Sequence, residues 1–414
     1  MKKTILQEVL KGIKPSTEEE KAFSTKINSV LKRIKLKDAK AILGGSGIKG
    51  TWLKEAHDAD IFVRFDYNRY KDKSSELPNI LEKALKKEFK ITRLHGSRDY
   101  FQIKQKGFTF EIIPILEIKK AEQAKNITDV SPLHAKWVNK HKQLQDEMRL
   151  TKQFCKAAKA YGAESYIKGF SGYVCEILTV YYKSFLNLMK NASKWKEKTI
   201  IDAAHFYKNK EALYILNKSK IQSPLIIIDP VQKDRNAAAA LSKEKFDLLI
   251  KKSKEFLKNP SKKFFEKKEF SLDDLKDKAK NKELITLNIR VKSGKRDIIG
   301  CKLLKSLDFF NKQLLKNDFK VLEYGWDWNE SSKALFYFTL KKETLSKNKI
   351  WGGPPLKAKQ HVKIFKKKYK KTFVKKGKIY ANIDRAYLKP GDLIKDLIKH
   401  DYLKDKIKEI KNEK

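Results

Sequence analysis

The stretch LGGSGIKGTWLKEAHDADIFVRF, residues 43–65, determines the fold of the N-terminal part and the place of its chemistry. Asp58 and Asp60 lie in an apolar run typical of a buried strand, and side chains alternate along a strand, so both carboxylates face the same side. Two such carboxylates repel each other unless a cation lies between them, and Mg²⁺ prefers carboxylate and phosphate oxygens. A D-x-D pattern also occurs on ordinary surface strands, so by itself it does not predict a metal site.

A glycine-rich turn precedes these acids and favours a nucleotide site. Gly44, Gly45 and Ser46 come before the strand, and Lys49 follows them. Glycines let backbone N–H groups approach a phosphate closely, while a hydroxyl and an ammonium group add donors. The segment therefore predicts that a phosphate and a metal ion bind near the start of the strand.

A third carboxylate, Glu111, lies in GFTFEIIPILEI, residues 107–118. An unpaired glutamate in so apolar a strand is costly. If this strand neighbours the one that carries Asp58 and Asp60, the three acids converge on two metal ions. That arrangement is typical of enzymes that catalyse in-line displacement at phosphorus.

The composition is that of a folded, strongly basic protein. A chain of 414 residues allows about two to four domains, and a hydrophobic content of 41% is enough for real cores. Lysine and arginine number 95 against 50 acidic residues, and the formal net charge of +45 favours a nucleic acid as the partner. A general bias toward lysine is the alternative explanation, because lysine is spread along the whole chain.

Other features argue against a membrane or secreted protein. No run approaches the roughly 18 apolar residues of a membrane span, and we see no signal peptide at the N-terminus. Cys155, Cys175 and Cys301 have neither metal-ligand spacing nor the pattern of a disulfide framework. We therefore expect a cytoplasmic protein with no membrane association.

Hydrophobic periodicity divides the chain into an α+β block, a helical block and a second α+β block. Ser16, with Glu19 three residues later, forms a capping box that predicts a helix start. In the first block we expect strands at 41–43, 59–65, 91–94, 100–105 and 108–116, and a helix at 79–89. Later we expect helices at 146–160 and 356–370, a helix that starts near Asn236, strands at 284–291 and 333–340, a chain break at 351–355 and a hairpin turn at 376–377.

The glycine–serine turn, the D-x-D strand and the later strand carboxylate together resemble the DNA polymerase β nucleotidyltransferase superfamily. Further motifs follow in order: SPLHAKWV (131–138), EMRLTKQFCKAAKAYGAE (147–164), IKGFSGYVCEIL (167–178), IIDPVQKDRNAAAALS (227–242) and GGPP (352–355). Together these motifs closely resemble the archaeal, class I, CCA-adding tRNA nucleotidyltransferases. The resemblance covers nearly the whole chain.

This resemblance implies an α+β fold with a nucleotidyltransferase head that holds a small mixed sheet, a helical neck, and an α+β body and tail. It implies a catalytic head at residues 1–135, a nucleotide-selecting neck at 136–256 and a tRNA-binding body and tail at 257–414. The family adds C, C and A to the tRNA 3′ end from CTP and ATP, without a nucleic-acid template and with two Mg²⁺ ions. The oligomeric state stays open, and a homodimer is one of the options.

The same resemblance gives roles to the three acids. Asp58 and Asp60 match the metal ligands of the family. Glu111 completes the catalytic triad, binds metal and helps to activate the primer 3′-hydroxyl. The family usually has aspartate at this third position, so Glu111 departs from the pattern by one methylene group.

The resemblance also places the triphosphate and sugar of the nucleotide among Ser46, Lys49, His134, Lys152 and Tyr161. In this arrangement the lysines supply positive charge to the phosphate oxygens, and His134 can donate a hydrogen bond. Taken alone, a histidine or tyrosine of this kind is more often structural.

Arg235 resembles the family arginine that meets the incoming base. Its planar fork of donors can read cytosine and adenine edges while disfavouring other bases. Taken alone, it would be an ordinary surface arginine. We expect Glu176, in contrast, to be structural and to pair with a nearby arginine.

The basic C-terminal helix resembles the family tail that grips the top of the tRNA. Lys363, Lys366, Lys367 and Lys370 are the expected RNA contacts, and they alternate with aromatic residues that suit stacking. A solvated helix face is the ordinary alternative for such a run of lysines.

Two alternative functions stay open. A poly(A) polymerase or oligoadenylate-type enzyme would share the three acids but not the fixed C-C-A product, and the Arg235 segment and the tail separate it from the CCA-adding enzymes. A non-catalytic RNA-binding protein with a decayed site is the other alternative. The complete set of acids and the intact glycine turn argue against decay.

Overall fold

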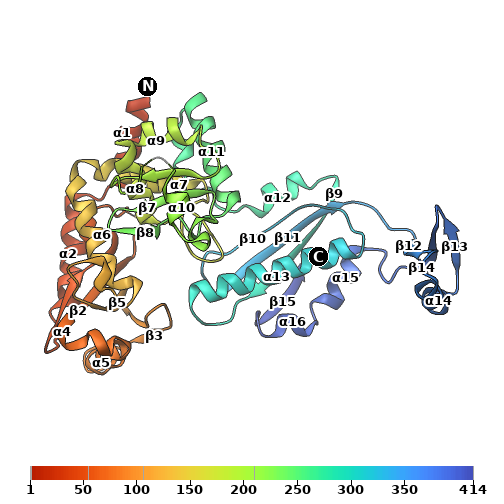
Figure 1. The fold of residues 1–414 in the computed structure, drawn as a ribbon, viewed down its shortest axis with the longest axis horizontal. Coiled ribbons are helices and arrows are strands. Elements are labelled where there is room, and N and C mark those ends of the chain that lie inside the picture. Colours follow the sequence, from red (N-terminus) through yellow and green to blue (C-terminus); the bar gives the residue numbers. More distant parts are fainter. Residues whose placement is uncertain (1, 55, 106, 209, 414) are drawn as a thin grey trace. The chain divides into compact units, whose positions relative to one another are not determined.

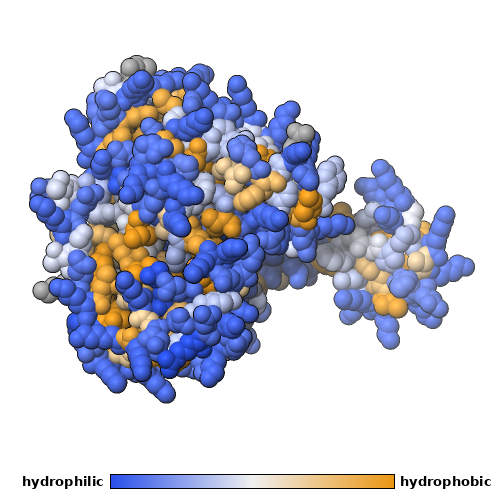
Figure 2. Space-filling view, turned by 60° about the vertical axis from the view of Figure 1, so that its left-hand side comes forward, coloured by the Kyte–Doolittle hydropathy of each residue, from blue (hydrophilic) through white to orange (hydrophobic). Residues whose placement is uncertain are grey.

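The computed structural model describes residues 2–54, 56–105, 107–208 and 210–413, which fall into two compact units (Figure 1). Unit 1 is Met1–Lys268 and unit 2 is Glu269–Lys414. Both units combine helices with small sheets, so the predicted α+β class is confirmed. Hydrophilic side chains cover most of the face drawn in Figure 2, as the high charge predicts. Among the described helices, none is long and apolar enough to cross a membrane.

The N-terminal part of unit 1 is built on a five-stranded mixed sheet with the order β1-β2-β5-β4-β3. The strands are β1 (Ala39–Leu43), β2 (Asp58–Phe65), β3 (Thr92–Leu94), β4 (Tyr100–Gln105) and β5 (Phe108–Leu116). β2 pairs with β5 in parallel and with β1 antiparallel. The predicted strands are confirmed, and β2 and β5 are neighbours, as the convergence of the three acids requires.

Helices pack on this sheet and close its core. They are α2 (Thr17–Leu31), α3 (Gly45–Lys49), α4 (Tyr67–Tyr70) and α5 (Leu77–Leu85), whereas α1 (Lys2–Ile13) packs on α7 in the helical part of the unit. α2 begins with the predicted capping box, in which the Ser16 hydroxyl accepts from the Glu19 backbone N–H and the Glu19 carboxylate accepts from the Ser16 N–H. Phe23 and Ile27 of α2 join the core under the sheet.

The second part of unit 1 is mainly helical. It contains α6 (Ser131–Val138), α7 (Gln145–Ala157), α8 (Gly172–Tyr182), α9 (Phe185–Ala192), α10 (Ala212–Ile215) and α11 (Lys243–Lys258). A small sheet adds β6 (Thr199–Asp202), β7 (Leu225–Asp229) and β8 (Gln232–Asn236). α7, α8, α9 and α11 share one apolar core, and α7 packs directly on α8.

One predicted helix start in this part is wrong. Asn236 ends strand β8, and the next helix, α11, begins only at Lys243, after the N-cap Ser242. The Asn236 side chain accepts hydrogen bonds from the backbone N–H groups of Ile227 and Ala238, which ties it to β7. This tertiary bonding overrides the helix propensity of the four alanines that follow.

Unit 2 contains a four-stranded antiparallel sheet with the order β10-β11-β9-β15. Its strands are β9 (Lys282–Arg290), β10 (Val321–Asp327), β11 (Lys333–Lys341) and β15 (Glu409–Glu413), and its helices are α12 (Leu272–Lys278), α13 (Arg296–Lys316), α15 (Pro390–Leu397) and α16 (Asp401–Lys404). α13 runs along this sheet in Figure 1, and Leu303 and Phe310 of α13 belong to the same core as Phe336 and Phe338 of β11.

A second, smaller sheet in unit 2 has the order β12-β14-β13 and packs against α14 (Lys359–Lys368). The strands are β12 (Asn348–Pro355), β13 (Thr372–Lys375) and β14 (Lys378–Asp384), so the predicted hairpin turn at Lys376-Gly377 is confirmed. The predicted chain break at residues 351–355 is wrong, because this segment belongs to β12. β12 is an edge strand with a register shift between Gly352 and Pro355, where prolines are tolerated.

Candidate nucleotide and metal site

The three acids lie on one face of the head sheet, on two neighbouring inner strands. Asp58 and Asp60 lie on β2, and Asp60 is in direct register with Glu111 on the parallel strand β5. Gln102 of β4 is the partner of Glu111 on the other side, and its Nε2 donates to Glu111 Oε1 at 2.9 Å. Asp58 is exposed, whereas Asp60 and Glu111 are half-buried.

Repulsion among these carboxylates affects Asp60 most. Burial, followed by the charges of Glu111 and Asp58, raises the pKa of Asp60 to about 7, and only the positive charge of Lys49 opposes the rise. Keeping this carboxylate ionised therefore costs free energy, and a bound cation would remove that cost.

The residues present fit a hard divalent cation by their chemistry. Carboxylate oxygens are the ligands that Mg²⁺ prefers, and here they come from neighbouring strands. In the described ranges, no three His, Cys, Asp or Glu side chains are arranged so that they could hold a metal ion as they stand. The acids therefore share a face without forming a closed metal site.

The glycine turn packs directly against Asp60. Gly45 has φ +52°, and a Cβ on it would lie 1.7 Å from Asp60 Oδ2. A Cβ on Gly44 would lie 2.4 Å from the Phe62 ring, and the Gly44 N–H donates to the Asp60 carbonyl at 2.8 Å. Both glycines are thus required where the turn meets the strand, and this contact places Ser46 of α3 near the acids.

Lys49 and Lys152, both predicted to meet the triphosphate, are joined by Glu176. Lys49 Nζ donates to Glu176 Oε2 at 2.9 Å, and Lys152 Nζ donates to Glu176 Oε1 at 2.7 Å. The Thr51 hydroxyl donates to Glu176 Oε1 and accepts from Lys152 Nζ, both at 2.7 Å. We call these four residues the Glu176 cluster; all four are buried.

Opposite charges decide the ionisation of this cluster. Burial alone raises the pKa of Glu176, but Lys152 and Lys49 outweigh it and hold the pKa at about 2. Burial lowers the pKa of Lys152, and Glu176 counteracts this effect. The cluster therefore holds two ammonium groups against one carboxylate.

The expectation that Glu176 pairs with an arginine is wrong. Arg149, the nearby candidate, instead donates to the carbonyls of Gly50 and Trp52 at 2.7 and 3.1 Å. It also pairs with Asp146 on its own helix at 2.5 Å. Arg149 thus fixes the chain that follows Lys49, while the lysines take the buried carboxylate.

His134 and Arg235 meet at a buried acid that sequence reasoning missed, Asp229. Its Oδ2 bonds to His134 Nε2 at 3.0 Å and accepts from Arg235 Nη1. Its Oδ1 accepts from the Tyr173 hydroxyl at 3.2 Å and from the Val231 N–H at 3.0 Å. Asp229 is fully buried, so it fixes residues from α6, α8 and β8 to one point.

This arrangement restricts what His134 can offer a nucleotide. Burial lowers the pKa of His134, although Asp229 opposes the shift. A neutral imidazole donates from one nitrogen only, and a proton on Nε2 directed at Asp229 makes Nδ1 an acceptor. The ring stacks on Tyr173 at 4.1 Å between centroids, and Lys49 Nζ lies 5.0 Å from the Tyr173 ring centroid. Tyr173 therefore connects the Asp229 group with the Glu176 cluster.

Tyr161 lies in the segment between α7 and α8, and its hydroxyl is close to Gly172, the first residue of α8. It forms a β-bridge with Phe170, and a Cβ on Gly172 would lie 2.8 Å from the Tyr161 hydroxyl oxygen. Burial raises the pKa of Tyr161 well above its usual range. The structure thus gathers the acids, the glycine turn, the lysines, His134, Tyr161 and Arg235 in unit 1.

The four predicted RNA-binding lysines lie elsewhere. Lys363, Lys366 and Lys367 are on α14, Lys370 follows it, and all four are exposed in unit 2. The signal for the missed residues was present in the sequence, since Glu176 and Asp229, like Glu111, are acids in strongly apolar segments.

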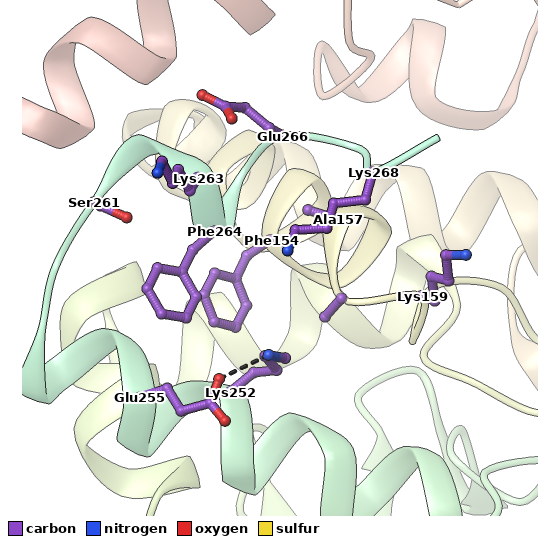
Figure 3. Close-up of a pocket in the computed structure, with 11 residues that line it drawn as sticks. Phe154, Ala157, Lys159, Lys252, Glu255, Ser261, Lys263, Phe264, Glu266 and Lys268 are labelled. Carbon is purple, nitrogen blue, oxygen red and sulfur yellow. Dashed lines mark hydrogen bonds and ion pairs between the residues drawn. The ribbon is translucent and has the colours of Figure 1, made fainter. Parts of the chain in front are cut away.

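A cavity of about 430 Å³ in unit 1 contains none of the predicted site residues. Figure 3 shows the rings of Phe154 and Phe264 beside each other there, with several lysines around them. Lys252 and Glu255 on its wall pair with each other at 2.7 Å. The cavity is therefore separate from the acids of β2 and β5.

Three family descriptions match successive parts of the chain. Residues 1–140 match the second messenger oligonucleotide or dinucleotide synthetase domain, residues 146–266 the second domain of tRNA nucleotidyltransferase, and residues 280–413 the C-terminal domain of the CCA-adding enzyme. Solved structures share the fold: one of Cid1, described as an RNA terminal uridylyl transferase, has a TM-score of 0.52 at 14% identity and covers 65% of this chain and 98% of that chain.

Full-length relatives extend the match across both units. The CCA-adding enzyme of Nanoarchaeum equitans is 38% identical over 349 residues, which are 83% of this chain and 84% of that enzyme. The CCA-adding enzyme of Methanocaldococcus jannaschii is 33% identical over 411 residues, which are 95% and 90% of the two chains. Nucleotidyltransferases of this superfamily generally use divalent metal ions. The resemblance seen in the sequence motifs is confirmed, and the chain is a nucleotidyltransferase that belongs to the family of CCA-adding enzymes.

Proposed function

We propose that this chain adds C, C and A in order to the 3′ end of tRNA, with CTP and ATP as donors and no nucleic-acid template. The primer 3′-hydroxyl attacks the α-phosphate and pyrophosphate leaves. The observation that supports this most is the register of Asp60 with Glu111 beside the glycine turn, because it combines a cation site with a phosphate site. Most of the catalysis is then positioning and charge neutralisation.

In this proposal Asp58, Asp60 and Glu111 hold two Mg²⁺ ions. When bound, these ions supply neutralisation of the phosphate charge and activation of the attacking hydroxyl. Gln102 orients Glu111 by donating to its Oε1, so that the longer side chain takes the place of the usual aspartate and helps to activate the primer 3′-hydroxyl. Gly45 keeps the space at Asp60 Oδ2 open.

The remaining site residues position the nucleotide. Ser46 and Lys49 receive the triphosphate together with the backbone of the glycine turn, and Lys152 adds its positive charge from behind Lys49. His134 and Tyr161 border the sugar and phosphates. Arg235, held by Asp229, presents its remaining donors to the base edge, which selects cytosine and adenine.

The division of labour along the chain is part of the proposal. Residues 1–135 carry out the chemistry, residues 136–256 select the nucleotide and residues 257–414 bind the tRNA, with Lys363, Lys366, Lys367 and Lys370 at its backbone. We place this reaction in the cytoplasm. Nothing in the proposal depends on whether the chain acts alone or as a homodimer.

The match of residues 1–140 to second messenger synthetases favours one other candidate, an enzyme that joins free nucleotides into oligonucleotides. Such an enzyme would need no tRNA primer. The lysine-rich surface of unit 2 and its match to the CCA-adding C-terminal domain favour the tRNA reaction.

One experiment separates these functions. The full chain is incubated with Mg²⁺ and a tRNA that lacks its last three nucleotides, and each NTP is supplied alone or with the others. We expect two cytidines from CTP alone and a complete CCA end from CTP plus ATP, read by sequencing, while mature tRNA stays unextended. Oligonucleotides formed without tRNA, or long adenosine tails, would contradict the proposal.

A further inference from the structure

The Glu176 cluster carries an excess of buried positive charge. Lys49 and Lys152 bring two ammonium groups, Glu176 brings one carboxylate, and Thr51 is neutral. The side chains of Lys152 and Glu176 are only 4% and 1% exposed, so solvent does little to neutralise the excess. An unbalanced buried charge is costly, and an anion that approaches the cluster would remove this cost.

The two lysines differ in what they have left to offer. An ammonium group has three N–H donors, and Lys152 directs three hydrogen bonds to the Thr51 carbonyl, the Thr51 hydroxyl and Glu176. Lys49 makes one side-chain hydrogen bond among the described residues, to Glu176. Lys49 is therefore the member with donors to share, and Lys152 is locked behind it.

The charge of Lys49 is directed toward the acids. It counteracts the rise that burial, Glu111 and Asp58 impose on the pKa of Asp60, so it acts at the place where the metal and the α-phosphate would meet. Its ammonium group also lies 5.0 Å from the ring of Tyr173, which stacks on His134. The open side of the cluster thus faces the proposed nucleotide.

We propose that Glu176 is a positioning residue for nucleotide binding, which locks Lys152 in place and shares Lys49 with the triphosphate of the incoming CTP or ATP. This inference rests on the proposed function. Glu176 itself does not touch the nucleotide; it pairs with both buried lysines and fixes where Lys49 presents its donors.

The charge of Glu176 makes a specific prediction about pH. The titratable groups that face Lys152 and Glu176 are Lys49, Tyr161, Tyr173 and Cys175, and Asp60 faces Lys49. Glu176 is the carboxylate that counteracts the burial of Lys152, whereas Lys49 also faces Asp60, so Glu176→Gln leaves Lys152 without its counter-ion. Burial then lowers the pKa of Lys152 further, and Lys152 loses its proton as the pH rises.

The test measures the Kd of CTP by calorimetry with the full chain and Mg²⁺, between pH 6 and pH 9. The ratio of the Glu176→Gln Kd to the wild-type Kd cancels the titration of CTP itself. We expect this ratio to rise about tenfold over the range as one positive charge is lost. The control is Glu147→Gln, which removes a partly buried carboxylate that accepts from the Phe185 N–H and touches neither lysine; its ratio should stay flat.

A flat ratio for a folded Glu176→Gln variant would overturn the inference. If that variant does not fold, Glu176→Asp is the test, because it keeps the negative charge but moves it away from the lysines by one methylene group. KM for CTP and ATP should then rise several-fold while kcat stays within twofold. An unchanged KM would overturn the inference. Failure of the proposed function would appear in the wild-type chain, which would then not extend truncated tRNA. The two failures are therefore distinguishable.

Discussion

The acids of the head sheet and the Glu176 cluster are two charged groups of opposite sign in the same unit. The first brings together three carboxylates, of which Glu111 receives a neutral amide donor and Asp60 has a pKa raised to about 7. The second is buried more deeply, yet each of its charges has an opposite charge within 2.9 Å. The acids mainly repel one another, whereas the cluster supplies most of its own counter-charge.

This difference indicates what each group is for. Carboxylates that repel one another on a half-buried face destabilise the fold unless a cation binds, so their arrangement is understandable as a binding site. The Glu176 cluster stabilises itself and keeps only one charge in excess, which suits reversible binding of a substrate. A nucleotide triphosphate with its metal ions complements both, because it brings cations to the acids and anions to the lysines.

The largest expected effect follows from replacing Asp60 by Asn. Addition of both C and A should fall by about a thousandfold or more, because the variant loses a metal ligand, while tRNA affinity stays near wild type. The metal-free variant should also melt at a higher temperature than the wild type. The folded-state pKa of Asp60 lies above its ordinary value, so its ionisation destabilises the wild type increasingly as the pH rises from about 4 to about 7, and Asn removes this effect.

Thermal melting at pH 5 and pH 8 checks the second half of this prediction. The gain in melting temperature should be larger at pH 8. Glu117→Gln is the control, because Glu117 is an exposed acid just past β5 that pairs with Arg64 at 3.1 Å; it should keep both activity and melting temperature. An Asp60→Asn variant that loses stability at pH 8 would show that Asp60 is structural.

A smaller loss, about a hundredfold in kcat/KM, is expected for Gly45→Ala. Its Cβ would lie 1.7 Å from Asp60 Oδ2 and must displace that carboxylate or the turn. The control is Gly107→Ala, which shares the positive φ but has nothing within 4 Å of the added Cβ. Both variants should lose about 1–2 kcal/mol of stability through backbone strain, and only Gly45→Ala should lose activity. Equal activity losses in the two variants would refute this explanation.

The same comparison shows how far the sequence could be read. The acids and the glycine turn are local signals. The period-two alternation predicts the strands and the face to which the acids point, and the turn is one that only glycine fits. The predicted strands β2, β4 and β5 are confirmed. The Glu176 cluster depends on α3, α7 and α8 meeting, and its partners are 24 and 127 residues apart in the chain. Nothing local distinguishes a lysine partner from an arginine partner, so the expected pairing was wrong.

Asp229 illustrates the second limit. Asp229 lies in a motif that the sequence shows, but its role as a buried acid that collects His134, Tyr173 and Arg235 is not predicted, since these residues come from three different elements. In the same way Asn236 is held in β8 by side-chain hydrogen bonds to Ile227 of β7 and to the carbonyl of Lys220. Tertiary contacts decide what propensity alone leaves open.

Arg235→Ala should have a moderate effect that is confined to base selection. A good pair of hydrogen bonds to a base edge discriminates by about 1–3 kcal/mol, so the preference of kcat/KM for CTP and ATP over UTP and GTP should fall about tenfold or more. Triphosphate affinity should change little, because the Glu176 cluster, which includes Lys49, remains. Lys220→Ala is the control: Lys220 pairs with Asp234, the neighbour of Arg235 on β8, and its removal should leave the base preference unchanged. An unchanged preference in Arg235→Ala would remove this residue from base selection.

The smallest effect on catalysis is expected for the tail, where the lysines of α14 lie far from any compensating acid in sequence and are exposed rather than buried. Each phosphate contacted by a cationic side chain releases counter-ions, and the slope of log K against log salt is roughly −0.7 to −0.9 per contact. Changing Lys363, Lys366, Lys367 and Lys370 together to Ala should therefore flatten the slope for full tRNA. It should leave kcat with saturating tRNA nearly unchanged, because chemistry takes place in unit 1.

Two controls test whether the flatter slope comes from contacts made by the tail: a shorter RNA substrate, and a variant that loses the same charge elsewhere. A minihelix that contains only the acceptor end should bind more weakly than tRNA, still react, and show nearly the same slope with wild type and variant, since a tail that grips the top of the tRNA has nothing to grip. Removing an equal charge from exposed lysines of unit 1, Lys190, Lys194, Lys251 and Lys254, separates a local contact from a general loss of net charge. If that variant flattens the tRNA slope as much as the tail variant does, or if the minihelix slope falls with the tRNA slope, the lysines of α14 are an ordinary solvated helix face and the tRNA is held elsewhere.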